Sequence, residues 1–185
     1  MVDKIDYSFL SELEGGSKKS GYVPAVGVSK SGVTVGTGFD LGQRNESDLK
    51  NLGLSSELIA ILKPYLGKKA KDAQDVLDKH PLTITVAQAE VIDKAVKRSH
   101  VDLIKFKYNS VAENKKKFTD LPAEAQTVIA SVSFQYGASL DVRAPKFWKA
   151  AKAQNWKECI KVLNNYGDGY PTRRKKEAAL LGEMK

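Results

Sequence analysis

The sequence predicts a mostly helical α+β fold, and three observations lead to this class. At 185 residues, with 42% hydrophobic and 28% charged residues, the chain is long and apolar enough to bury a core. Apolar residues recur at helical spacing along most of it. Only the stretch from about 17 to 42 departs from that spacing, with several glycines and the alternation Val33-Thr34-Val35-Gly36-Thr37 that is typical of short strands joined by tight turns.

The elements can be justified in chain order. Apolar residues such as Leu10 and Leu13 predict a first helix over about 5–14, which Gly15-Gly16 ends before the β-like stretch. Thr85-x-x-Gln88 is typical of a capping box and opens a long helix, and Asp120-Leu121-Pro122 is expected to cap another. The other expected helices cover about 55–64, 69–79, 144–153, 155–165 and 172–182.

This order of elements predicts one domain over 1–185 with two lobes. The small lobe covers about 1–65 and contains the β-hairpin region 17–42, and the larger helical lobe covers about 85–185. The long helix joins them. Clefts between lobes are favoured ligand sites, so we expect the active site there.

Charge and composition narrow the function classes. The net charge of +8 favours acidic partners, including nucleic acid and the carboxylate-bearing peptidoglycan. No apolar run approaches the roughly 18 residues of a membrane span, so we expect no stable membrane insertion. The single cysteine, Cys159, excludes an internal disulfide and is expected in the core, and the isolated His80 and His100 indicate no metal site and no cofactor.

Three side chains near the start of the chain suit glycosidic cleavage. That reaction needs a protonated acid at the leaving oxygen and an ionised carboxylate on the other face of the sugar. A carboxyl group pressed against an apolar core has a raised pKa and can serve as the acid. Glu14 at the helix end fits the role of the acid, and Asp40 on a polar turn fits the role of the base. Thr34 lies between them and can hold a water. Glycines 32, 36, 38 and 42 would let a sugar chain approach the backbone.

Several segments then match a known family in order. They are Leu13-Glu14-Gly15, the block from Ser31 to Gly42 with Thr34-Val35-Gly36-Thr37-Gly38-Phe39-Asp40-Leu41-Gly42, Phe134-Gln135-Tyr136-Gly137, Asn155-Trp156, and the loop from Asn165-Tyr166 to Tyr170-Pro171-Thr172-Arg173-Arg174. From about residue 9 to 182 the chain resembles the pesticin-type lysozyme domain, a branch of the T-even phage lysozyme-like muramidases, which are glycoside hydrolases.

The resemblance implies a lysozyme-like two-lobe fold. It also implies a muramidase that cleaves the β-1,4 bond between N-acetylmuramic acid and N-acetylglucosamine. Glu14 would be the general acid, Asp40 the base and Thr34 the hydroxyl that orients water, with inversion expected. In phage lysozymes proper the aspartate precedes the threonine, whereas here it follows, as in pesticin-type domains. Arg173 or Arg174 would approach Glu14, and the expected sugar contacts are Tyr22, Phe39, Gln135, Tyr136 and Arg173.

The biological setting remains open at this point. The chain starts without the features of a secretory signal, so we expect synthesis in the cytoplasm and action in the periplasm or on the cell wall, after holin-assisted release or delivery by a secretion system. We expect the chain to act as an endolysin or an antibacterial effector and to be a monomer. An immunity protein and delivery machinery are candidate partners. The alternatives are a basic helical nucleic-acid binder, which we do not expect, a non-catalytic wall-binding module, and membrane disruption by the basic C-terminal helix.

Overall fold

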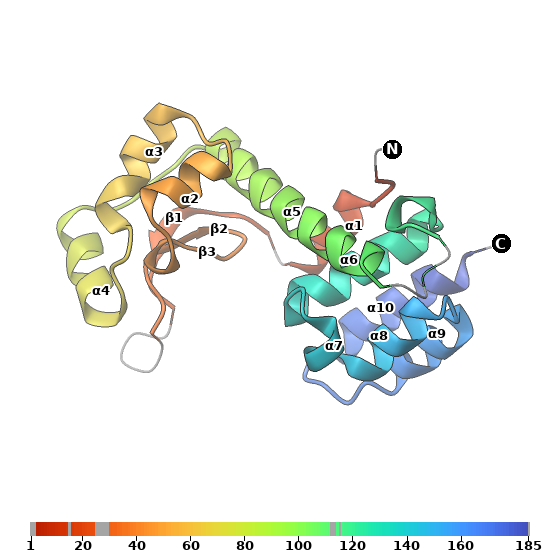
Figure 1. The fold of residues 1–185 in the computed structure, drawn as a ribbon. Helices are drawn as coiled ribbons and strands as arrows, with labels where there is room; N and C mark the ends of the chain where they lie inside the picture. The colour runs from red at the N-terminus through yellow and green to blue at the C-terminus, as the bar shows by residue number, and fades with distance from the viewer. Residues whose placement is uncertain (1–2, 15, 25–29, 112–113, 115, 185) are drawn as a thin grey trace. The chain divides into compact units, whose positions relative to one another are not determined.

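The computed structural model describes residues 3–14, 16–24, 30–111, 114 and 116–184, and it divides into two compact units (Figure 1). One unit is Glu14–Ser99, and the other combines Met1–Leu13 with His100–Lys185. Each has its own apolar core. The mostly helical α+β class is confirmed, since ten α-helices and a three-stranded sheet form within the described residues. The expected lobes, about 1–65 and 85–185, are bounded differently from these units, and the single domain stays a prediction.

The sheet lies in the unit Glu14–Ser99 and is antiparallel, in the order β1-β2-β3. Its strands are β1 (Lys18–Tyr22), β2 (Thr34–Gly36) and β3 (Phe39–Asp40). Thr34 lies opposite Tyr22 on one side and opposite Asp40 on the other, and Val35 lies opposite Phe39. The expected β-hairpin region is thus confirmed where it is described, although residues 25–29 of the stretch lie outside the described residues.

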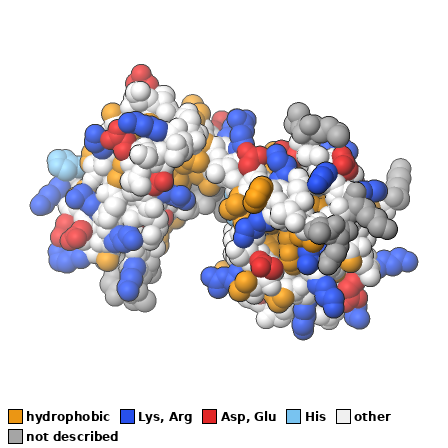
Figure 2. Space-filling model, viewed as in Figure 1, with side chains coloured by type: hydrophobic (Ala, Val, Ile, Leu, Met, Phe, Trp, Pro, Cys, Tyr) orange, Lys and Arg blue, Asp and Glu red, His pale blue; other side chains and the backbone are white. Residues whose placement is uncertain are grey.

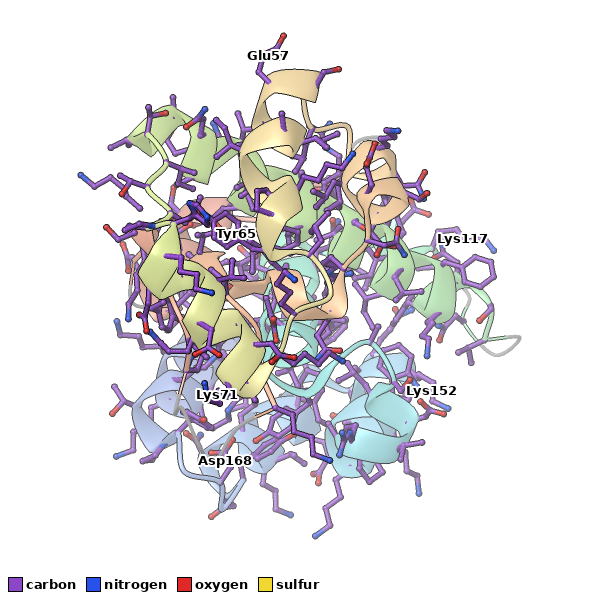
Figure 3. All side chains as sticks on the ribbon, turned by 90° about the vertical axis from the view of Figure 1, so that its left-hand side faces the viewer. Glu57, Tyr65, Lys71, Lys117, Lys152 and Asp168 are labelled. Carbon is purple, nitrogen blue, oxygen red and sulfur yellow. The ribbon has the colours of Figure 1, made fainter. Side chains whose placement is uncertain are left out.

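Short helices accompany the sheet in this unit (Figure 1). They are the 3-10 turn η1 (Leu41–Gln43), α2 (Glu46–Asn51), α3 (Ser56–Leu62), the 3-10 turn η2 (Lys63–Tyr65) and α4 (Ala70–Lys79). Asn45 and Asp48 form a capping box at α2, and the Leu58 N–H donates to the Ser55 hydroxyl oxygen at α3. Tyr65, which is labelled in Figure 3, is buried in the core. Its hydroxyl donates to the His80 carbonyl oxygen over 2.8 Å.

The long helix α5 (Val86–Asn109) begins in one unit and ends in the other. Its start confirms the predicted capping box: the Gln88 N–H donates to Thr85 Oγ1 over 3.1 Å, and the Thr85 N–H donates to Gln88 Oε1 over 2.9 Å. Ala89 and Ile92 are buried on the helix, whereas Val91 is exposed. The buried face of α5 therefore passes through Ile92 and not through Val91.

The regular elements of the second unit are all helices within its described residues. It contains α1 (Tyr7–Leu13), the 3-10 turn η3 (Phe118–Asp120), α6 (Ala123–Tyr136), α7 (Leu140–Arg143), α8 (Pro145–Lys152), α9 (Trp156–Asn164) and α10 (Pro171–Gly182). The core includes Leu10 of α1, Val128 of α6, Phe147 of α8 and Leu181 of α10. Cys159 is buried among them, as expected.

Two local expectations need correction. Asp120 does not cap α6, because it lies in η3 and the helix starts at Ala123 after Pro122, with no side-chain cap. Neither α2 nor α7 was expected from the sequence. Of the two glycines expected to end the first helix, Gly15 and Gly16, Gly15 lies outside the described residues.

Candidate active site

Glu14 follows directly on the last residue of α1. The helix starts at a fixed point, because the Phe9 N–H donates to Asp6 Oδ1 over 3.0 Å and Leu10 is anchored in the core. The Glu14 side chain is 15% exposed, and its Oε2 lies 3.0 Å from Lys97 Nζ, whose own side chain is 9% exposed. A mostly buried carboxylate at this point of the chain is therefore paired with a mostly buried cation from α5.

Thr34 and Asp40 are direct cross-strand partners on β2 and β3. Thr34 is 3% exposed, and its hydroxyl donates to the Gly32 carbonyl oxygen over 3.2 Å. Asp40 Oδ1 accepts the N–H groups of Gly42, over 2.8 Å, and of Gly32, over 2.9 Å. Both bonds that the described part of the chain makes to this carboxylate fall on Oδ1. The other oxygen, Oδ2, is thus the atom that can act on a water.

The turn between these two strands is held by α5. Asp93 Oδ1 accepts both the N–H and the hydroxyl of Thr37, each over 2.9 Å. Asp93 and Lys97 are both buried, and residues four apart share one face of a helix. Neither was expected at the site. The available signal was the presence of two charged residues four apart within the long helix α5.

The glycines of this region make room mainly for the protein's own chain. A Cβ on Gly32 would lie 2.4 Å from the Gly42 Cα, and one on Gly42 would lie 2.5 Å from the Lys68 carbonyl oxygen. A Cβ on Gly36 would lie 2.5 Å from Asp93 Oδ1. Of the four glycines expected to admit a sugar, only Gly38 has open space at its Cβ position. For the other three glycines, the lack of a side chain is explained by the packing of the protein's own atoms.

The two aromatic residues expected to contact sugar in this unit differ in exposure. Tyr22 is half-buried, and Lys18 Nζ lies 4.0 Å from its ring centre. Phe39 is 4% exposed and belongs to the core, with Arg44 over its ring at 5.4 Å. Phe39 therefore packs the hairpin against the core and leaves almost no surface for a ligand.

Gln135 and Tyr136 lie at the end of α6 in the other unit, and both are half-buried. The Tyr136 hydroxyl donates to Asp168 Oδ2, and its ring stacks on Tyr166 with centres 5.5 Å apart. Burial, together with the bond to Asp168, raises the pKa of Tyr136 well above its usual range. Asp168 lies in the loop before α10 (Figure 3). Tyr136 is therefore fixed by its own unit.

The two arginines of α10 belong to the same network. Arg173 Nη2 donates to the Ser131 carbonyl and hydroxyl oxygens over 3.0 Å, and its Nε lies 3.3 Å from Glu177 Oε1. Arg174 is 1% exposed and pairs with Glu177 Oε2 at 2.5 Å. Burial raises the pKa of the Glu177 carboxyl, and the Arg174 guanidinium opposes that shift. Two cations of the run 172–176 are thus turned inward, which weakens the case for a phosphate-binding patch.

Arg173 also borders an open cavity of about 340 Å³ within this unit. Glu12 and Leu13, at the end of α1, line the same cavity, and so do Tyr170 and Lys176. The expected approach of Arg173 or Arg174 to Glu14 concerns residues of two different units and stays a prediction. The partner of Glu14 within its own unit is Lys97.

Two further searches concern ligands and membranes. Among the described residues, no group of three or more His, Cys, Asp or Glu side chains could hold a metal ion. No helix in the described part of the chain has both the length and the apolar character needed to cross a membrane.

The mostly helical fold with its small antiparallel sheet is consistent with a lysozyme-like domain. The family model described as "Pesticin: Bacterial toxin homologue of phage lysozyme, C-term" matches residues 4–157. The chain therefore belongs to the pesticin family, and the resemblance seen in its motifs is confirmed. No curated protein matches it.

Proposed function

We propose that the protein is a muramidase, which hydrolyses the β-1,4 bond between N-acetylmuramic acid and N-acetylglucosamine in peptidoglycan. The observation that carries the proposal is the mostly buried Glu14–Lys97 pair, in the unit whose hairpin also sets Thr34 opposite Asp40. Membership of a family of phage-lysozyme homologues supports it. The substrate is a glycan strand whose peptides bear carboxylates, which suits a chain of net charge +8.

The three side chains take different parts in the proposed reaction. Glu14 donates a proton to the leaving glycosidic oxygen as that bond breaks. Asp40 accepts, through Oδ2, a proton from the water that attacks the anomeric carbon, and the Thr34 hydroxyl oxygen receives a hydrogen bond from that water. Asp40 Oδ1 remains bound to Gly32 and Gly42, which fixes the direction of Oδ2. Inversion at the anomeric carbon is part of the proposal.

The paired state of Glu14 sets a condition on this reaction. A general acid must carry a proton when it acts, whereas the carboxylate in the structure faces the Lys97 ammonium at 3.0 Å. Protonation of Glu14 removes the attraction of the pair. The reacting Glu14 therefore has to carry its proton on one oxygen, while the other oxygen can still accept a hydrogen bond from the Lys97 ammonium.

The decisive experiment measures the release of reducing sugar ends from purified peptidoglycan. Glu14→Gln should lower the rate by about 10²–10⁴, the usual contribution of a general acid, with the fold retained. Glu90→Gln is the matched control, because it removes an exposed carboxylate from α5. A folded wild-type protein that releases no reducing ends would leave a wall-binding module. Full activity in Glu14→Gln would remove the acid from the scheme.

The biological role follows from the same activity. We propose action on the cell wall as an endolysin or as an antibacterial effector, with delivery by other proteins. Expression in bacteria with and without an added export signal tests this: lysis is expected only on export, and only with Glu14 intact. The anomeric form of the first product, measured by NMR on soluble glycan fragments, tests inversion.

A further inference from the structure

One face of α5 holds two separate parts of the proposed active site. Lys97 reaches Glu14, which follows α1, and Asp93 reaches Thr37, in the turn between the strands that carry Thr34 and Asp40. The two α5 residues stand one helical turn apart. Because both contacts come from one rigid helix, the position of Glu14 and the position of the hairpin depend on the same element.

These charges are costly where they lie. Taking an ionised side chain out of water carries a free-energy penalty, and the attraction within a buried ion pair often does no more than offset it. Apolar residues at these positions, like the neighbouring Ile92, would pack into the core without that penalty. The structure is shaped around Asp93 as well, since a Cβ on Gly36 would lie 2.5 Å from Asp93 Oδ1. Stability alone does not account for the two charges.

We infer that Lys97 and Asp93 are positioning residues for the proposed reaction: Lys97 aims the Glu14 carboxyl, and Asp93 anchors the hairpin turn beside Thr34 and Asp40. Neither touches the reacting atoms. The inference rests on the proposed function, because positioning has a purpose only if Glu14 acts. Displacements of about 1 Å in a catalytic group can cost about 10²-fold in rate, so the orientation of Glu14 is worth fixing.

Substitutions at Lys97 separate charge from packing. Lys97→Met keeps an unbranched side chain of similar length and loses the ammonium, whereas Lys97→Arg keeps a cation. We expect Lys97→Met to lower kcat about tenfold or more with KM within about twofold, and Lys97→Arg to recover most of the rate. Lys94→Met is the control, because Lys94 is exposed on the same helix. Equal kcat in Lys97→Met and wild type would overturn the role of Lys97.

Thr37→Val gives a milder second test if the Lys97 variants fold poorly. It removes the hydroxyl that donates to Asp93 and leaves the Thr37 N–H in place. The same pattern is expected, a lower kcat with an unchanged KM. A rise in KM at constant kcat would instead indicate a direct contact with the sugar and would contradict positioning.

An NMR measurement keeps this inference separate from the muramidase proposal. Three-bond couplings of Glu14 report its χ1 rotamer without any substrate. One rotamer is expected in wild type and Lys97→Arg, and averaging over rotamers in Lys97→Met. If wild type releases no reducing ends but the couplings change as expected, the proposed function fails and the geometric role of Lys97 stands. A single Glu14 rotamer in Lys97→Met would overturn the positioning role even in an active enzyme.

Discussion

Gly36 offers the sharpest test of how the hairpin is held. Its φ of +60° is in the left-handed region, and a Cβ there would lie 2.5 Å from Asp93 Oδ1 and 3.3 Å from Asp93 Cγ. Gly36→Ala therefore imposes two separate costs. The backbone is strained, and the Asp93 carboxylate has to move away from Thr37.

The magnitude follows from these two costs. An alanine in the left-handed region costs roughly 1–2 kcal/mol. A displaced Asp93 loses at least one of its two hydrogen bonds from Thr37, and a bond to a charged group contributes about 1.5–3 kcal/mol. We therefore expect Gly36→Ala to lower the free energy of unfolding by about 2.5–5 kcal/mol. That is a large part of the roughly 5–15 kcal/mol that stabilises a typical domain.

Gly53 supplies the matched control in the same unit. Its φ is +73°, close to that of Gly36, and the space around its Cβ position is open. Gly53→Ala should cost only the strain of roughly 1–2 kcal/mol. In a background of Asp93→Ala, the cost of Gly36→Ala should fall to the same value, because the colliding carboxylate is gone.

The assay must report the unit Glu14–Ser99 specifically. Both tryptophans of the chain, Trp148 and Trp156, lie in the other unit, so their fluorescence does not report it. Amide hydrogen exchange of peptides from 30–51, measured by mass spectrometry, gives the local free energy of opening. Equal costs for Gly36→Ala and Gly53→Ala, or an unchanged cost when Asp93 is alanine, would refute the contact with Asp93 as the cause.

Three further predictions concern single side chains. Asp40→Ala should destabilise the hairpin by about 1–3 kcal/mol for each of the two N–H groups, of Gly32 and Gly42, that it leaves without an acceptor. Asp40→Asn keeps the accepting Oδ1 and should lose only the release of reducing ends. Equal urea midpoints for the two variants would contradict this. Burial lowers the pKa of His100 below 6.5, so the stability linked to its neutral form is complete above that pH and is lost as the pH falls through the lowered pKa. Melting temperatures of His100→Gln should therefore fall less on acidification than those of wild type, and parallel curves would exclude His100 as the cause. Burial raises the pKa of Cys159 to about 12, so iodoacetamide should label this single thiol only in denaturant, and rapid labelling of the native protein would contradict its burial.

The fold was predictable where the signal was local. The capping box of Thr85 and Gln88 involves residues three apart, so the start of α5 could be found from the sequence. The six residues of α2 contain one buried apolar residue, Leu49, and no periodic stripe, and the capping box of this helix uses Asn45 and Asp48 in place of the usual Ser/Thr and Glu/Gln. Asp120 resembled a cap but lies in a 3-10 turn, because η3 takes the residues just before α6. The preference of Asp120 for a helix cap was therefore overridden by the 3-10 turn η3.

The site was predictable only in part, because its contacts are tertiary. Glu14, Thr34 and Asp40 could be selected from residue chemistry and family resemblance. The pairing of Glu14 with Lys97 joins the start of the unit Glu14–Ser99 to its end, and nothing near either residue in the sequence specifies this contact. The sequence suggested Arg173 or Arg174 as the cation beside Glu14, which stays a prediction, and it gave no indication of Lys97. A cation on a buried helix face indicates that a partner exists but does not identify it.

The hairpin block that identifies the family is also the block that the fold itself requires. Gly32 and Gly42 lie against each other, and Asp40 ties their N–H groups together. Phe39 fills the core. A chain that kept only the fold would need the same residues, so the block is stronger evidence for family than for catalysis. Glu14 differs in this respect, because among the described residues it caps no backbone group. Its carboxylate is instead paired with a second mostly buried charge, Lys97, whose burial costs free energy. The case for an enzyme therefore depends more on Glu14 and its pair than on the motif that first suggested it.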